Sequence, residues 1–243
     1  DGNLTATTNA NNGSITLNDI AVDGTIVLNT HGSGNATVVN DVGLQFASST
    51  VGGNLHATST TGNMTQSGAL DIEGTTTLIT SADDATINLG TSSNAFTGAL
   101  LITTNDSGAD TAGDVSIHGG TTALVLGDST IDGDLTLTST ATSATGISDS
   151  GTLDIRGTTT ISASGVDITL NSAANNFQGA VGIEGSDVIL VDAGTIDLGA
   201  STVTGTYNLT AGGSVTDSGA LAITGVTTID ASSGNVTLNT TTN

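Results

Sequence analysis

The chain repeats its own sequence, and this self-similarity restricts its fold more than any other feature. The segment SGALDIEGTTTLI at 67–79 returns as SGTLDIRGTTTIS at 150–162 and as SGALAITGVTTID at 218–230. Further blocks recur in the same order around it, so that Phe96 corresponds to Phe177. The repeat is about 70–80 residues long, which exceeds the roughly 20–50 residues of common solenoid repeats. Each repeat should therefore hold several smaller units.

Within each repeat, apolar residues occur in pairs that are two positions apart. This spacing puts both side chains on one face of a β-strand, whereas the i, i+3, i+4 spacing of an amphipathic helix does not occur. Gly, Asn, Asp or Ser residues separate the pairs, as expected for turns. A strand is predicted at each pair: Leu70/Ile72, Ile87/Leu89, Leu100/Ile102, Val115/Ile117, Leu124/Leu126, Leu135/Leu137, Leu153/Ile155, Ile168/Leu170, Val181/Ile183, Val188/Leu190, Ile196/Leu198, Leu221/Ile223 and Val236/Leu238.

Strands of this kind fit either an antiparallel sandwich or a parallel β-solenoid. Hairpin dipeptides such as Asn12-Gly13 and Asp23-Gly24 are too few to join every pair of strands. The inward residues, mostly Ala, Val, Ile and Leu, suit the narrow interior of coils that stack at about 4.8 Å. We therefore predict an all-β, right-handed parallel β-helix (β-solenoid) of about 20 residues per coil, with about four coils per repeat and about twelve coils in all.

The predicted solenoid is one continuous body over residues 1–243. Its long repeats are expected at 1–48 (partial), 49–128, 129–200 and 201–243 (partial). The chain has no proline, in keeping with strands that are paired on both sides and need every backbone N–H group. Residues 106–113 and 141–145 are expected to loop out between coils.

The chain is strongly acidic. Its formal net charge is −22, with 23 acidic residues, one Arg and no Lys. This charge opposes binding to nucleic acid and to anionic membrane surfaces, which both attract Lys and Arg. Cysteine is absent, which excludes a disulfide framework and thiolate metal sites, and no apolar run approaches the roughly 20 residues that span a bilayer. We expect no nucleic-acid partner and no membrane insertion in this segment.

Strings such as GDLTLTS, SGTLDIRGTTTIS, DITLNSAANNF and GNVTLN give the chain a resemblance to a known family. Over essentially its whole length it resembles the repeat regions of filamentous-haemagglutinin-like adhesins, which are two-partner-secreted or autotransporter-type bacterial proteins. The resemblance implies a right-handed β-helix, an extracellular or bacterial cell-surface location, and a role in adhesion or biofilm structure. The family's N-terminal secretion domain has no match here.

Catalytic motifs are weak throughout the sequence. His31, His56 and His118 are far apart, and none belongs to a metal motif such as HExxH. A polysaccharide lyase would need basic residues, whereas this chain has a single Arg. Asp pairs that could serve a glycoside hydrolase all lie among turn residues. We therefore expect no enzymatic activity, no catalytic residues and no organic cofactor.

Clustered carboxylates make calcium the leading hypothesis for a bound ion. Calcium takes carboxylate, amide and carbonyl oxygen ligands, and acidic residues gather in two groups of the sequence. Neither group matches an EF-hand loop or a GGxGxDxUx nonapeptide, and Asp in turns commonly caps the backbone through its own side chain. The candidate calcium ligands are Asp106, Asp110 and Asp114, followed by Asp128, Asp132 and Asp134.

The abundance of Thr and Asn suggests two further surface features. Thr runs at 75–77, 158–160 and 227–228 recur once per long repeat rather than once per coil, so a continuous ice-binding array is not expected. Sequons for N-glycosylation occur at Asn3, Asn35, Asn63, Asn105, Asn208 and Asn235.

The leading functional hypothesis is a structural stalk, a rigid spacer in a large secreted or cell-surface adhesin that supports adhesion or biofilm formation. The first alternative is a self-assembling extracellular filament or S-layer-like matrix protein, and the second is a carbohydrate-active β-helix enzyme. Both ends of the chain consist of ordinary repeat sequence, whereas solenoids need terminal caps for solubility. The expected partners are adjacent coils of the same parent chain or head-to-tail copies, and host or neighbouring-cell glycans or proteins.

Overall fold

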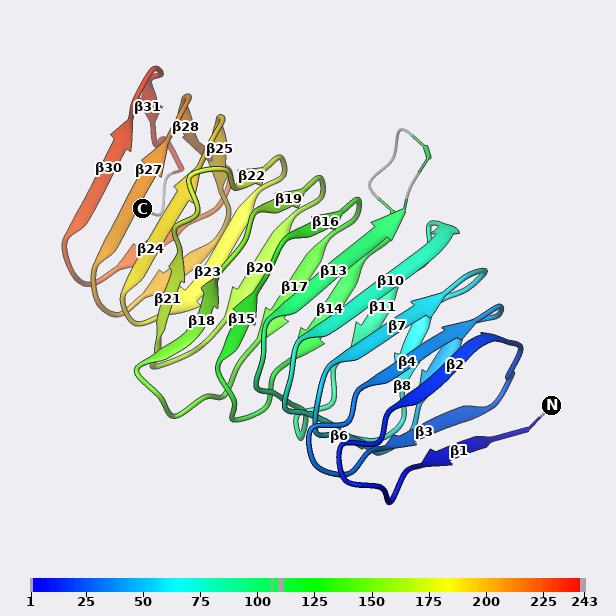
Figure 1. The fold of residues 1–243 in the computed structure, drawn as a ribbon. Helices are drawn as coiled ribbons and strands as arrows, with labels where there is room; N and C mark the ends of the chain where they lie inside the picture. The colour runs from blue at the N-terminus through cyan, green and yellow to red at the C-terminus, as the bar shows by residue number, and fades with distance from the viewer. Residues whose placement is uncertain (1, 106, 109–111, 241–243) are drawn as a thin grey trace.

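The chain forms a parallel β-solenoid. The computed structural model describes residues 2–105, 107–108 and 112–240, and these residues form about 11 turns spaced about 21 residues apart, with no helix. The coils stack in sequence order, so that the first strands lie at one end of the solenoid and the last strands at the other (Figure 1). The predicted all-β parallel solenoid and its approximate coil length are confirmed.

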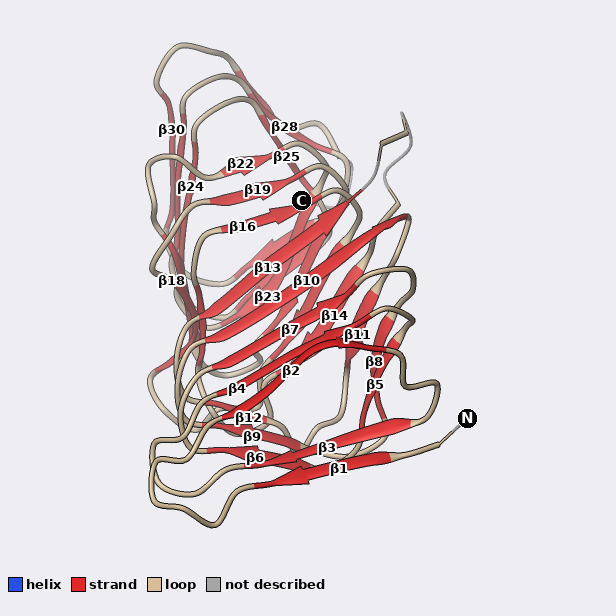
Figure 2. Cartoon of the chain, turned by 45° about the vertical axis from the view of Figure 1, so that its right-hand side comes forward, coloured by secondary structure: helices blue, strands red, loops and turns tan. Residues whose placement is uncertain are grey.

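Two parallel sheets run along the stack, and the chain passes from one to the other in every turn (Figure 2). Sheet A contains β1 (Leu4–Thr7), β3 (Thr25–Asn29), β5 (Leu44–Phe46), β6 (Ser49–Val51), β8 (Met64–Gln66), β9 (Leu70–Ile72), β11 (Ile87–Leu89), β12 (Ala95–Phe96), β14 (Val115–His118), β17 (Leu135–Thr138), β20 (Thr159–Ser162), β23 (Val181–Gly185), β25 (Ile196–Leu198), β26 (Ser201–Val203), β28 (Val215–Asp217), β29 (Leu221–Ile223) and β31 (Val236–Thr237). Sheet B contains β2 (Ile15–Ile20), β4 (Ala36–Asn40), β7 (Leu55–Ser59), β10 (Thr76–Asp83), β13 (Leu100–Asn105), β15 (Leu124–Leu126), β16 (Ser129–Ile131), β18 (Thr145–Asp149), β19 (Leu153–Ile155), β21 (Asp167–Leu170), β22 (Asn176–Phe177), β24 (Val188–Asp192), β27 (Tyr207–Ala211) and β30 (Thr227–Ala231).

The i, i+2 pairs supply the interior of the solenoid. Leu70 and Ile72 are buried while Asp71 between them is exposed, because successive side chains of a strand point to opposite faces. Every predicted pair from Leu70/Ile72 to Ile196/Leu198 is buried. Val236 and Leu238 are exposed instead. They lie in the last described coil, which has a neighbouring coil on one side only.

The few aromatic residues all lie in this interior. Phe46, Phe96, Phe177 and Tyr207 are each no more than 1 % exposed. The Tyr207 hydroxyl has no hydrogen-bond partner among the described residues, and burial raises its pKa. The aromatic rings therefore add to the packed core and not to the outer faces.

Each half-turn is built in one of two ways. It is either a single strand, such as β7, or a split pair of short strands, such as β8 and β9. From β4 to β30, single strands and split pairs alternate with two exceptions. Within each alternating stretch, all split pairs lie on the same sheet. At β13–β14 and again at β23–β24, two single strands follow each other, and the split pairs then move to the other sheet.

The insertion predicted at 141–145 lies in a loop except for its last residue. Residues 139–144 lie outside strands between β17 and β18, and Thr145 is the first residue of β18. The insertion expected at 106–113 includes residues 106 and 109–111, which lie outside the described residues.

Candidate functional surface

Asn side chains cap the backbone where the chain enters the single strands of sheet B. Asn35 Oδ1 accepts the N–H of Asn54 at 2.8 Å, and Asn54 Oδ1 accepts the N–H of Thr75 at 2.9 Å. Gly53 and Gly74 precede two of these positions, and a Cβ atom on Gly74 would lie 2.6 Å from the carbonyl carbon of Gly53. Successive coils thus approach too closely at this corner for any residue with a side chain.

Farther along the stack, the equivalent corners are built with carboxylates, with Asp114 and Asp134 before single strands of sheet A and Asp187 before a single strand of sheet B. Asp114 Oδ1 accepts the N–H of Asp134 at 2.9 Å, and Asp134 Oδ1 accepts the N–H of Thr158 at 2.6 Å. Asp187 does the same for Thr206 at 2.6 Å. The backbone and hydroxyl hydrogen bonds from Thr206 lower the pKa of Asp187 because they stabilise its charged form. These side chains continue the hydrogen-bond ladder around the corner of the coil.

The predicted calcium ligands do not form a cluster in the described part of the chain. Asp106 and Asp110 lie outside the described residues. Asp128 Oδ1 accepts the N–H of Thr152 at 2.8 Å, and no group of three or more His, Asp or Glu side chains among the described residues could hold a metal ion. Calcium binding stays a prediction, and the candidates that are described cap the backbone or join an ion pair: Asp114, Asp128, Asp132 and Asp134.

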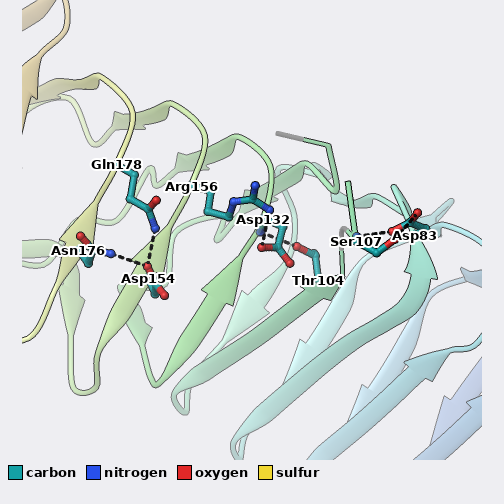
Figure 3. Close-up of polar contacts among 8 residues, drawn as sticks. All are labelled: Asp83, Thr104, Ser107, Asp132, Asp154, Arg156, Asn176 and Gln178. Carbon is teal, nitrogen blue, oxygen red and sulfur yellow. Dashed lines mark hydrogen bonds and ion pairs between the residues drawn. The ribbon is translucent and has the colours of Figure 1, made fainter. Parts of the chain in front are cut away.

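A second polar row follows the ends of β13, β16, β19 and β22 on sheet B (Figure 3). Arg156 Nη1 lies 3.3 Å from Asp132 Oδ1, and Thr104 Oγ1 accepts the N–H of Asp132 at 3.0 Å. The row links neighbouring coils across the surface. Its other contacts join Asp154 Oδ1 to Asn176 Nδ2 at 2.8 Å and to Gln178 Nε2 at 3.0 Å, and Ser107 to Asp83.

The three histidines lie in different places. His31 is in an exposed loop after β3, whereas His56 faces outward on β7 of sheet B. His118 ends β14 of sheet A, and its Nδ1 accepts the N–H of Gly120 at 2.9 Å. In the described part of the chain, none of them belongs to a group of side chains that could hold a metal ion.

The role of two buried asparagines was not predicted from the sequence. Asn94 Oδ1 accepts the N–H of Leu70 at 2.9 Å, and Asn175 Oδ1 accepts the N–H of Leu153 at 2.9 Å. Asn175 Nδ2 also donates to Asp149 Oδ2 at 2.7 Å. Each Asn stands two residues before a buried Phe, and that recurrence was the available signal. Both amides hold split strands together inside the coil.

Three shallow hollows lie on the outer face of sheet A, with volumes of about 310, 340 and 230 Å³. One register row runs through all three, and each member pairs with the next across adjacent strands. We term this row with its hollows the axial groove. Its floor consists of Gln45, Thr65, Asn88, Ser116, Thr136, Thr160 and Gly182, and its carboxylates are Asp23, Asp114, Asp134 and Glu184.

The parallel stack and its recurring corners define a repeat β-solenoid structural protein. A family model matches the chain three times, at residues 33–103, 112–184 and 185–243. The chain therefore belongs to the family described as "Repeats of unknown function (DUF5649)". No curated protein and no solved structure matches it. No helix among the described residues is long and apolar enough to cross a membrane.

Each of the first two family copies contains an odd number of half-turns. The copy at 33–103 starts on sheet B with β4 and ends on sheet B with β13, which makes seven half-turns. The copy at 112–184 also has seven half-turns, but it starts and ends on sheet A, with β14 and β23. One repeat is therefore three and a half turns rather than the predicted four, and consecutive copies start on opposite sheets.

Proposed function

We propose that this chain is a rigid spacer within a large secreted or cell-surface adhesin. The observation that carries the proposal is unbroken stacking, because sheet B pairs one coil with the next from β2 to β30 without a gap. At about 4.8 Å per coil, the turns add up to a rod of about 50 Å. Such a rod holds a binding module away from the cell surface.

The surface chemistry supports an extracellular location. A charge of −22 keeps a long rod soluble, and a chain without cysteine does not depend on the redox state of its compartment. The resemblance to filamentous-haemagglutinin-like adhesins adds the expected role in adhesion or biofilm formation. The proposal is structural, with no catalytic step.

Small-angle X-ray scattering of the purified chain tests the spacer. The expected particle is a rod about 50 Å long with a constant cross-section. Deleting residues 25–180 removes two repeats and replaces β3 with β23 on the same sheet, so the rod should shorten by about 34 Å. A full-length particle no longer than it is wide, or a deletion variant that does not shorten, would contradict the spacer. Failure of antibodies to label the parent protein on intact cells would contradict the surface location.

Self-assembly is the second candidate. On the last described coil, Val226, Val236 and Leu238 are 69 %, 49 % and 39 % exposed, and a coil face that exposes apolar side chains can add a further strand. Analytical ultracentrifugation over a range of concentrations separates the two functions. A head-to-tail filament grows in mass with concentration and is blocked by Val236→Asp, whereas a spacer stays monomeric.

A further inference from the structure

The axial groove has the dimensions of a site for an extended polymer. Its floor crosses seven successive strands of sheet A, from β5 to β23. Adjacent parallel strands lie about 4.8 Å apart, so the floor is about 29 Å long and runs along the solenoid axis. Six of its seven residues have a side chain that ends in a hydroxyl or an amide, and the seventh is Gly182.

We propose that the axial groove binds a linear, uncharged, hydroxyl-rich glycan that lies along the solenoid. The inference deepens the adhesive role and rests on the proposed surface location, since that is where the rod would meet such glycans. The spacer proposal is tested by the length of the rod, and the groove proposal is tested by glycan binding. Either proposal can therefore fail while the other holds.

The charges of the groove select against anionic ligands. Each hollow contains at least one carboxylate, namely Asp23 in the first, Asp114 and Asp134 in the second, and Glu184 in the third. Arg156, the single Lys or Arg of the chain, follows β19 on the other sheet. Sulfated or uronic-acid polymers would be repelled, whereas sugar hydroxyls can donate to carboxylates and exchange hydrogen bonds with Thr, Ser, Asn and Gln.

The geometry favours a glycan over a peptide. Sheets usually recruit extended peptides at their edges, through backbone hydrogen bonds, whereas the groove lies on the face of a sheet. Its rungs lie about 4.8 Å apart, and an extended peptide advances only about 3.4 Å per residue. No aromatic residue lines the hollows, so binding strength must come from many weak hydrogen bonds along the row. Affinity should therefore grow with the length of the glycan.

Isothermal titration of the full chain with unbranched oligosaccharides of two to eight sugars tests this site. The cello-, manno- and chito- series are the probes. At least one series should bind with a dissociation constant that falls about tenfold or more with length, equivalent to about 1.4 kcal/mol, and levels off when the floor is filled. Binding should change little between low and high salt, since the ligand carries no charge.

Two variants locate the binding, each with a control on sheet B. Ser116→Leu fills the second hollow and should weaken binding by about tenfold or more, whereas Ser148→Leu makes the same change at a half-buried, outward position of β18. Thr136→Ala removes one hydroxyl without adding bulk and should weaken binding about threefold, with Thr130→Ala as its control. Circular dichroism confirms that each variant is folded.

Three results would overturn the proposal. The first is no binding of any series at millimolar concentration. The second is an equal loss in the sheet A variants and the sheet B controls. The third is salt-sensitive binding of oligolysine in place of every glycan, which would make the groove a general cation-attracting surface.

Discussion

The first and second family copies place the same sequence on opposite sides of the molecule. Leu70–Ile72 forms β9 in sheet A, whereas its counterpart Leu153–Ile155 forms β19 in sheet B. Phe96 and Phe177 are likewise separated, in β12 and β22. A repeat therefore carries no fixed preference for one sheet. Its strands need only a neighbouring coil with the right register.

The copies also differ in the chemistry of their equivalent corners, which lead into sheet B in the first copy and into sheet A in the second, while sharing the geometry. Asn35 and Asn54 cap the backbone in the first copy, and Asp114 and Asp134 do so in the second. Amide and carboxylate oxygens accept equivalent backbone N–H groups at similar distances. Much of the acidic charge at these corners thus replaces a neutral cap without a change in fold.

Replacing either of the two equivalent phenylalanines should have the largest effect on stability. The two variants test directly whether the equivalent positions on the two sheets contribute equally. Phe96→Ala and Phe177→Ala should each lower the free energy of unfolding by about 3–5 kcal/mol, because both rings are buried. Urea denaturation followed by circular dichroism measures the loss. Ile189→Ala, at a 41 % exposed position, should cost much less. A small loss for only one Phe would show that the two sheets are not equivalent.

Adding a Cβ atom at the glycines of the corner should have the next largest effect on stability. A Cβ atom on Gly74 or Gly157 would lie 2.6 Å or 2.5 Å from the carbonyl carbon of the glycine one coil before. Gly74→Ala and Gly157→Ala should therefore each cost about 1–3 kcal/mol of stability, seen as a lower melting temperature. Gly2→Ala is the control, since no atom lies within 4 Å of its Cβ position. Equal melting temperatures for all three variants would remove the close-approach argument.

Removing a corner cap should cost about 1 kcal/mol in either copy, because one backbone N–H loses its acceptor. Asn54→Ala and Asp134→Ala test this. The exchanges Asn54→Asp and Asp134→Asn should cost less than the alanine variants, since both keep an oxygen for the next coil. Denaturation midpoints measure the difference. An exchange as costly as truncation would show that the charge itself matters at the corner.

A smaller effect depends on pH. Burial raises the pKa of Asp192, although the N–H groups of Phe177 and Gly194 oppose the shift. The folded state thus keeps the proton at pH values where the unfolded chain has lost it, so stability falls as pH rises through that window. The third copy has Asp192 where the first has buried Asn40. Relative to Asp192→Asn, the wild type should gain stability on acidification from pH 7 to pH 4, and a melting-temperature difference independent of pH would contradict this.

The smallest effect is expected at the ion pair. Arg156 and Asp132 are 31 % and 18 % exposed, and partly exposed pairs contribute about 0–1 kcal/mol. Arg156→Gln should therefore lower stability slightly at low salt and less in 0.5 M NaCl. Glu73 has the corresponding position in the first copy, and Glu73→Gln serves as the matched variant. A loss of several kcal/mol would show that this pair holds the coils together.

Strand spacing predicted the solenoid because an inward pair marks a strand wherever it occurs. The same spacing cannot assign a strand to sheet A or sheet B, and therefore the half-turn in each repeat was missed. Asp114 and Asp134 were predicted as calcium ligands because they belong to acidic clusters in the sequence. The sequence does not show that the side-chain oxygen of each accepts a backbone N–H from the next coil. The axial groove was also hidden, since Ser116 and Thr136 become neighbours only through the register of β14 and β17.

The odd number of half-turns makes the parity of the copy number meaningful. Gain or loss of one copy by recombination would rotate everything beyond it by half a revolution, whereas a change of two copies would restore the original facing. A module carried at the far end would thus point toward or away from a given neighbour according to whether the count is odd or even. Lineages that need a fixed facing should change their copies in pairs.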